Sequence, residues 1–108
     1  MSFDINTVIA DMLTAIKGSV DKDWKEVKSA SAQFLERDKS RMEMIATFRI
    51  SGELSQEDFE SKIEDQKMII EAELNALAVI SKAMAQNAAN AAIDILEKAV
   101  IGTIKAAL

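Results

Sequence analysis

The clearest reversal signal in the chain is the stretch Ile50-Ser51-Gly52-Glu53-Leu54-Ser55-Gln56-Glu57-Asp58-Phe59. Gly52 adopts a left-handed backbone with little strain, which suits the position just after the end of a helix. Ser55 is a typical N-cap, because its hydroxyl can accept a hydrogen bond from the free backbone N–H of Asp58. The carboxylates that follow Ser55 are favoured near the positive end of a helix dipole. The stretch therefore predicts that one helix ends near residue 50 and another begins near residue 56.

The composition on both sides of this turn favours long helices. The 108 residues include no proline and only three glycines, whereas average usage would supply about five prolines. Apolar residues recur at helical spacing both before and after the turn. We therefore expect an all-α fold with one domain, residues 1–108, in which two long helices, about 4–50 and 56–106, form an antiparallel helical hairpin.

Two boundaries of the first helix stay open in the sequence. Either Asp4 or Ser2 can cap its start. Gly18-Ser19 lies inside its apolar stripe. This pair is either a weak point in a continuous helix or a break after which Ser19 caps a new helix. Because the stripe passes through Gly18 in phase, we expect a continuous helix.

Near both termini the apolar residues exceed a single stripe. A helix that is apolar on most faces is usually buried on most faces, which a lone hairpin cannot achieve. We therefore expect self-association, with two hairpins forming a dimeric four-helix bundle that buries the terminal halves. The predicted oligomer interface consists of Ile5, Val8, Met12, Ile93, Leu96, Val100, Ile101 and Ile104.

An unknown protein partner and a membrane surface are the alternatives for this apolar end. The membrane surface is disfavoured because residues 93–108 lack an excess of lysine and arginine. The net charge of −5 also argues against a nucleic-acid partner, which normally meets a basic face.

The residue types present exclude much catalytic and metal chemistry. Histidine and cysteine are absent, so the chain has no disulfide, no imidazole or thiolate ligand, and no Cys or His nucleophile. Glu57, Glu60, Glu64 and Glu71 recur at helical spacing, but helix-bundle di-iron sites also need Glu-x-x-His pairs. We interpret these carboxylates as a solvated face. We expect no catalytic, cofactor-binding or metal site, and thus a protein that is not an enzyme.

The remaining candidates are polar residues, a tryptophan and methionines that lie either in the core or on the surface. Asn87, Asn90 and Asp94 are spaced so that they form either a polar patch that sets register inside an oligomer or part of an exposed face. Trp24 falls in phase with the core stripe. Core filling is also the favoured role of the methionines, although methionine-rich surfaces can bind varied helices. The methionines include Met42, Met44, Met68 and Met84.

The proportions of the chain resemble those of the WXG100 family of secreted helical-hairpin dimers, which are short and acidic with one central turn. In place of that family's Trp-x-Gly motif, this turn carries Ser51-Gly52-Glu53, and Trp24 lies within the first predicted helix. The resemblance implies a small secreted or phage-type hairpin that binds a second protein. This is the alternative to the function that we predict, a non-enzymatic helical oligomerisation protein.

The N-terminus has no basic region before an apolar run, and charged or polar residues interrupt every apolar stretch. A signal peptide needs the former, and a membrane span needs about 20 predominantly apolar residues. We therefore expect a cytoplasmic protein, with leaderless secretion left open.

Overall fold

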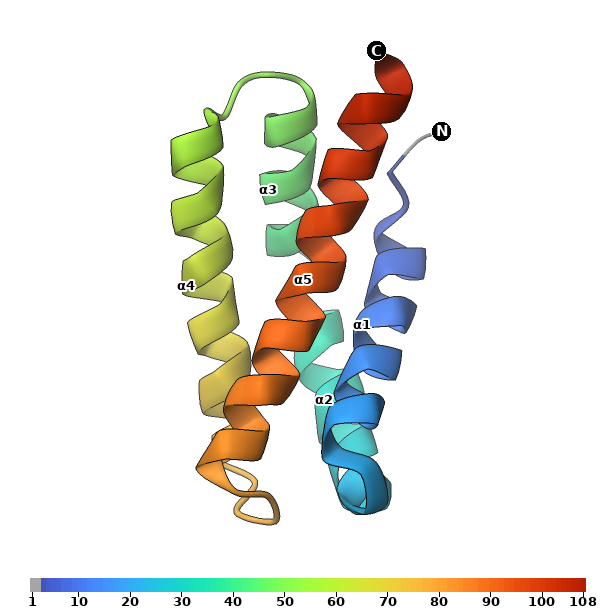
Figure 1. Ribbon diagram of the computed structural model, residues 1–108, viewed down its shortest axis with the longest axis vertical. Helices are drawn as coiled ribbons and strands as arrows, with labels where there is room; N and C mark the ends of the chain where they lie inside the picture. The colour runs from blue at the N-terminus through green and yellow to red at the C-terminus, as the bar shows by residue number, and fades with distance from the viewer. Residues whose placement is uncertain (1–2) are drawn as a thin grey trace.

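The chain folds as helices stacked side by side in a computed structural model that describes residues 3–108. In order, the elements are α1 (Ile5–Val20), the short 3-10 helix η1 (Asp21–Asp23), α2 (Trp24–Arg37), α3 (Lys39–Ile50), α4 (Gln56–Asn75) and α5 (Lys82–Ala107). Only Asp38 separates α2 from α3, so these two helices form one column. The four columns run alternately down and up (Figure 1). The prediction of an all-α fold is confirmed.

Each of the two long helices predicted from the sequence contains an additional reversal. The chain turns through η1 after Val20, and it turns again through residues 76–81 after Asn75. The prediction of continuous helices at about 4–50 and 56–106 is therefore wrong. One chain supplies all the columns of the bundle by itself, where the sequence predicted a hairpin with two columns.

The first additional reversal comes directly after the pair Gly18-Ser19. The helix includes this pair but ends at Val20, so the predicted continuity is wrong, and Ser19 Oγ donates to the carbonyl of Ala15 at 3.0 Å. That bond is the usual one for a serine inside a helix, so Ser19 is not an N-cap. The backbone then turns left-handed at Asp21, with φ of 51°. Residues 20–24, where the chain turns, include no glycine or proline, and the apolar stripe passes through Gly18 in phase, so helical spacing predicted a continuous helix.

The turn between α3 and α4 agrees with its prediction in detail. Gly52 has φ of 84°, and the backbone N–H of Asp58 donates to Ser55 Oγ at 3.1 Å. Arg49 Nη1 also donates to the carbonyl of Leu54 at 3.2 Å, which ties the end of α3 to the loop. Glycine and the serine cap thus fix the reversal from the local sequence.

Both termini lie at the same end of the bundle as the α3–α4 turn (Figure 1). The hairpin prediction places them at the opposite end, because it contains one reversal where the chain has three. Asp4 caps α1 by accepting from the backbone N–H of Asn6 at 3.0 Å. Ser2, the other predicted cap, lies outside the described residues. No helix within residues 3–108 is both long enough and apolar enough to cross a membrane.

The hydrophobic core runs along the bundle, and α5 contributes to it over most of its length. α5 packs most extensively on α1 and next on α4. The fully buried side chains in the first half of α5 are small, which lets the neighbouring helices approach closely. These fully buried side chains are Ala85, Ala88, Ala89 and Ala92.

Two glycines provide a matched test of the backbone. Gly18 lies within α1, and a Cβ atom added there meets nothing within 4 Å. We expect Gly18→Ala to raise the free energy of unfolding by about 0.4–1 kcal/mol, because alanine loses less conformational entropy on folding. Gly52 needs a left-handed backbone, so Gly52→Ala should lower that free energy by about 1–2 kcal/mol. Urea denaturation of both variants measures the two changes, and changes of the same sign would contradict this backbone.

Candidate interaction site

An apolar groove of about 270 Å3 lies between α3 and α4. We call it the α3–α4 groove. Its apolar lining comes from Met44, Ile45, Phe48, Leu54 and Ile69, and its polar lining from Arg41, Lys62, Asp65 and Gln66.

The α3 side of the groove carries large apolar side chains that reach solvent. Met44 and Phe48 lie one turn apart and are 56% and 42% exposed. The same helix sends Met42 and Ile45 into the core, so α3 has apolar residues on more than one face. We predicted apolar residues on more than one face only for the helices at the termini, and not for α3. The prediction that the methionines fill the core is confirmed for Met42 and wrong for Met44 and for Met68, which is 61% exposed.

The α4 side of the groove adds an apolar side chain and charges. Lys62, Asp65 and Ile69 lie on one face of the helix, because they follow each other at steps of three and four residues. Arg41 and Lys62 together give the lining a net charge of +1 beside the single carboxylate of Asp65. Within residues 3–108 neither cation forms an ion pair with a carboxylate. The groove is thus locally basic in a chain whose net charge is −5.

A buried polar network lies beneath the groove. Gln66 of α4 is 1% exposed, and Asp38 at the α2–α3 junction is 4% exposed. Gln66 Nε2 donates to Asp38 Oδ2 at 3.1 Å, and Arg41 Nη1 donates to Gln66 Oε1 at 3.4 Å. These bonds satisfy polar groups that would otherwise be buried without partners. They also tie α3 to α4 and so help to fix the width of the groove.

Arg37 extends this network to the surface. Its Nη2 donates to Glu73 Oε1 at 2.9 Å, and its Nε donates to Asp38 Oδ1 at 3.5 Å. The hydrogen bond that Arg37 donates to Glu73, followed by the negative charge of Glu73, raises the pKa of Arg37 above the ordinary value for arginine. Arg37 therefore stays charged and links α2 to α4 across the bundle. Because the pair is exposed to solvent, it contributes more to orientation than to stability.

A second hollow, between α4 and α5, is lined by acidic residues. Two of its four carboxylates are each paired with a lysine on their own helix, Glu64 with Lys67 at 2.9 Å and Asp94 with Lys98 at 2.7 Å. The hydrogen bond that Lys98 donates to Asp94 raises the pKa of Lys98. Within residues 3–108, no three acidic side chains are grouped closely enough to hold a metal ion. Asn87, Asn90 and Asp94 are all exposed in the single chain.

The structure brings most of the predicted interface residues together within one chain. Those that it buries belong to α1 and α5 and are at most 6% exposed: Ile5, Val8, Met12, Ile93, Leu96 and Val100. The two additional reversals account for this burial, because they fold α5 back onto α1. Their apolar character is therefore explained without a second subunit, and the structure assigns them to the core. Ile101 is 36% exposed and Ile104 is half-buried, so only these two reach solvent.

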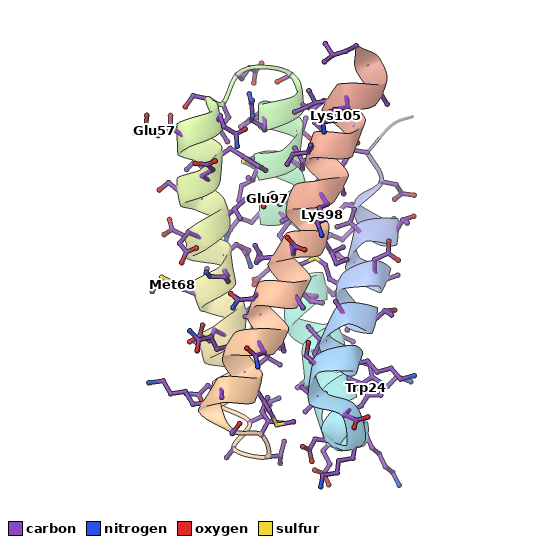
Figure 2. The ribbon with its side chains drawn as sticks, in the orientation of Figure 1. Trp24, Glu57, Met68, Glu97, Lys98 and Lys105 are labelled. Carbon is purple, nitrogen blue, oxygen red and sulfur yellow. The ribbon has the colours of Figure 1, made fainter. Side chains whose placement is uncertain are left out.

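Trp24, which the sequence places in the core stripe, is partly buried and packs against the edge of the core. Trp24 lies at the start of α2, and the exposed Met68 projects from α4 on the opposite side of the view (Figure 2). Met68 lies outside the α3–α4 groove. It can therefore serve as a reference for an exposed methionine outside this groove.

Comparisons of this chain with protein-family models, with curated proteins and with solved structures found no match. The two-helix hairpin implied by the resemblance to the WXG100 family is not the arrangement that the chain adopts. The site is therefore interpreted from its own geometry and chemistry.

Proposed function

We propose that this protein is a non-enzymatic interaction protein that binds an amphipathic helix of a partner protein in the α3–α4 groove. The observation that carries the proposal is the exposure of Met44 and Phe48 along a hollow whose lining is mainly apolar. Exposed apolar patches beside a hollow are typical of binding sites for protein partners. Covering these two side chains removes apolar area from water and so favours binding.

The shape of the groove favours a helix as the bound segment. α3 and α4 are antiparallel neighbours, and the ridges of a third helix can pack into the furrow between two such helices. Helix-in-groove recognition places apolar side chains at i, i+3 or i+4, and i+7 into an apolar lining. The unbranched side chain of Met44 adapts to different shapes, which suits this kind of recognition.

The charges of the groove favour an acidic flank on the partner helix. Arg41 and Lys62 have no carboxylate partner within residues 3–108, so carboxylates beside the apolar face of the partner can pair with them. Complementary charges mainly raise the association rate and select the orientation. Because the two cations are exposed, added salt should weaken this contribution.

The polar residues beneath the groove support a non-enzymatic role. Gln66 and Asp38 are hydrogen-bonded to each other. A general base or nucleophile must instead present a free polar atom to its substrate. The arrangement of Gln66 and Asp38 is that of residues that hold α3 and α4 together.

Self-association through the apolar end of the bundle is a second candidate function. It is favoured by Ile101, Ile104 and Leu108 near the C-terminus, of which Leu108 is fully exposed. Ile101 and Ile104 are the two members of the predicted interface that the core leaves accessible.

The proposed function is tested with two synthetic helical peptides that share one leucine face and differ in their flanks, glutamate in one and lysine in the other. We expect the glutamate peptide to bind the wild-type protein more tightly, because it pairs with Arg41 and Lys62. Met44→Glu should weaken its binding by at least about tenfold, which corresponds to 1.4 kcal/mol. Fluorescence anisotropy of the labelled peptides measures both effects.

Met68→Glu is the matched control, since it makes the same substitution at a methionine of similar exposure outside the groove. It should leave the affinity for the glutamate peptide unchanged. Failure of both peptides to bind the wild-type protein would contradict the proposal, and so would equal effects of the two substitutions.

A further inference from the structure

The loop that joins α4 to α5 contains a strained residue. Its residues 76–80 read Ala-Leu-Ala-Val-Ile and include neither glycine nor proline. The α4 pattern of hydrogen bonds continues into it, with the backbone N–H of Ala76 donating to the carbonyl of Ala72 at 3.0 Å. The reversal then depends on Ala78, which has φ of 61°. An L-residue with a Cβ atom is strained in this left-handed region, whereas Gly52 adopts it freely in the α3–α4 turn.

The local sequence of this loop favours a helix. Ile70, Leu74, Leu77 and Met84 follow at steps of four, three and seven residues, so the apolar stripe of α4 passes through the loop into α5 in phase. Alanine and leucine are also among the strongest helix formers. The only cap signal is Ser81, whose Oγ accepts from the backbone N–H of Met84 at 3.1 Å. Local preference and the observed reversal therefore conflict at this loop.

We propose that residues 76–80 form a hinge through which two copies of this chain exchange their α5 helices. When Ala78 relaxes into the right-handed region, α4 and α5 join into one helix from Gln56 to Ala107. α5 then leaves its own α1 and packs into the same position in a second, equally opened chain. Such an exchange of identical elements gives a dimer with little change in the contacts made.

The exchange preserves the core and releases the strain. The α1–α5 contacts of the monomer form again between the two chains. Core residues that the sequence predicts in an oligomer interface, such as Met12 and Leu96, then pack against residues of the other subunit. Opening also removes the left-handed Ala78. The apolar hinge residues of the two joined helices meet near the two-fold axis, which covers Val79, 43% exposed in the monomer. The exchanged dimer differs from the predicted pair of hairpins, because each bundle consists of three columns from one chain and α5 from the other.

The other left-handed reversal is a poorer hinge. Asp21 has φ of 51°, but it is followed by Lys22 and Asp23, and these charged residues prefer water to a contact between subunits. Ala78 is flanked by apolar residues on both sides. The two reversals therefore provide a hinge and a matched control within one chain.

The test compares three full-length variants with the wild type. Each protein is incubated near the midpoint of unfolding at high concentration, so that hinges open and chains meet, and is then returned to buffer. Sedimentation equilibrium gives the dimer association constant.

Ala78→Gly relieves the strain of the closed hinge and weakens the joined helix, so it should lower this constant by at least roughly fivefold. Ser81→Ala removes a cap that acts only in the closed form, so it should raise the constant by a similar factor. Asp21→Gly should leave it unchanged.

Isotope-filtered NMR on a dimer prepared from labelled and unlabelled chains identifies the interface. We expect contacts between α1 of one chain and α5 of the other. A wild-type protein that stays monomeric throughout would overturn the proposal, as would a dimer whose α1–α5 contacts all lie within one chain. A dimer association constant that changes with Asp21→Gly and not with Ala78→Gly would also overturn the proposal. Met44→Glu should leave the constant unchanged, so this test is independent of peptide binding in the α3–α4 groove.

Discussion

Phe59→Ala should lower the free energy of unfolding by about 3–5 kcal/mol, because it removes a large side chain from a packed core and leaves a cavity. Phe59 is 1% exposed on the first turn of α4. The loss is a large part of the roughly 5–15 kcal/mol that stabilises a typical domain. Urea denaturation followed by circular dichroism measures it.

Phe48→Ala is the matched control on the other side of the same turn. Phe48 is 42% exposed in the α3–α4 groove, so its removal should change the free energy of unfolding by no more than about 0.5 kcal/mol. The same substitution should weaken binding of the glutamate peptide, since it removes apolar area from the groove. A loss of stability as large as that of Phe59→Ala would mean that Phe48 belongs to the core and not to a binding surface.

The α3–α4 turn could be predicted because its causes are local. Gly52 permits the left-handed backbone, and Ser55 satisfies a backbone N–H of the next helix. Both effects act between residues that are neighbours in the sequence. They therefore hold whatever the rest of the chain does.

The other two reversals could not be predicted, because they oppose local preference. Asp21 and Ala78 are strained in their left-handed conformations, and the residues around Ala78 favour a helix. What opposes this strain is the burial of α5 on α1, a contact between the two ends of the chain. Helical spacing describes one element at a time, so it identified the apolar surface that must be buried. We assigned that burial to a second chain, whereas one chain buries most of the surface by itself.

The α3–α4 groove combines a part that could be predicted with a part that could not. The apolar excess on α3 is visible in the sequence from Met42 to Phe48. The pairing of Asp38 with Gln66 is not, because it joins residues on different elements through buried polar atoms. Helical spacing treats such polar residues as gaps in a stripe. Their role emerges only when α3 and α4 are placed side by side.

Leu96→Ala should lower the free energy of unfolding of the monomer by about 2–5 kcal/mol. Leu96 is fully buried in α5, and deleting its side chain leaves a cavity in the core. Leu108→Ala is the matched control near the end of the same helix. Because Leu108 is fully exposed, its substitution should change the free energy by no more than about 0.5 kcal/mol.

The concentration dependence of unfolding distinguishes the two roles that Leu96 can have. In the monomer its contacts lie within one chain, so the midpoint of unfolding should be the same at low and high protein concentration. If Leu96 were buried only between subunits, folding and association would be linked, and the midpoint would rise with concentration. Denaturation of freshly purified monomer across the micromolar range measures this. A rising midpoint would contradict the intramolecular bundle, and a constant midpoint with a large effect of Leu96→Ala requires that one chain buries α5 by itself.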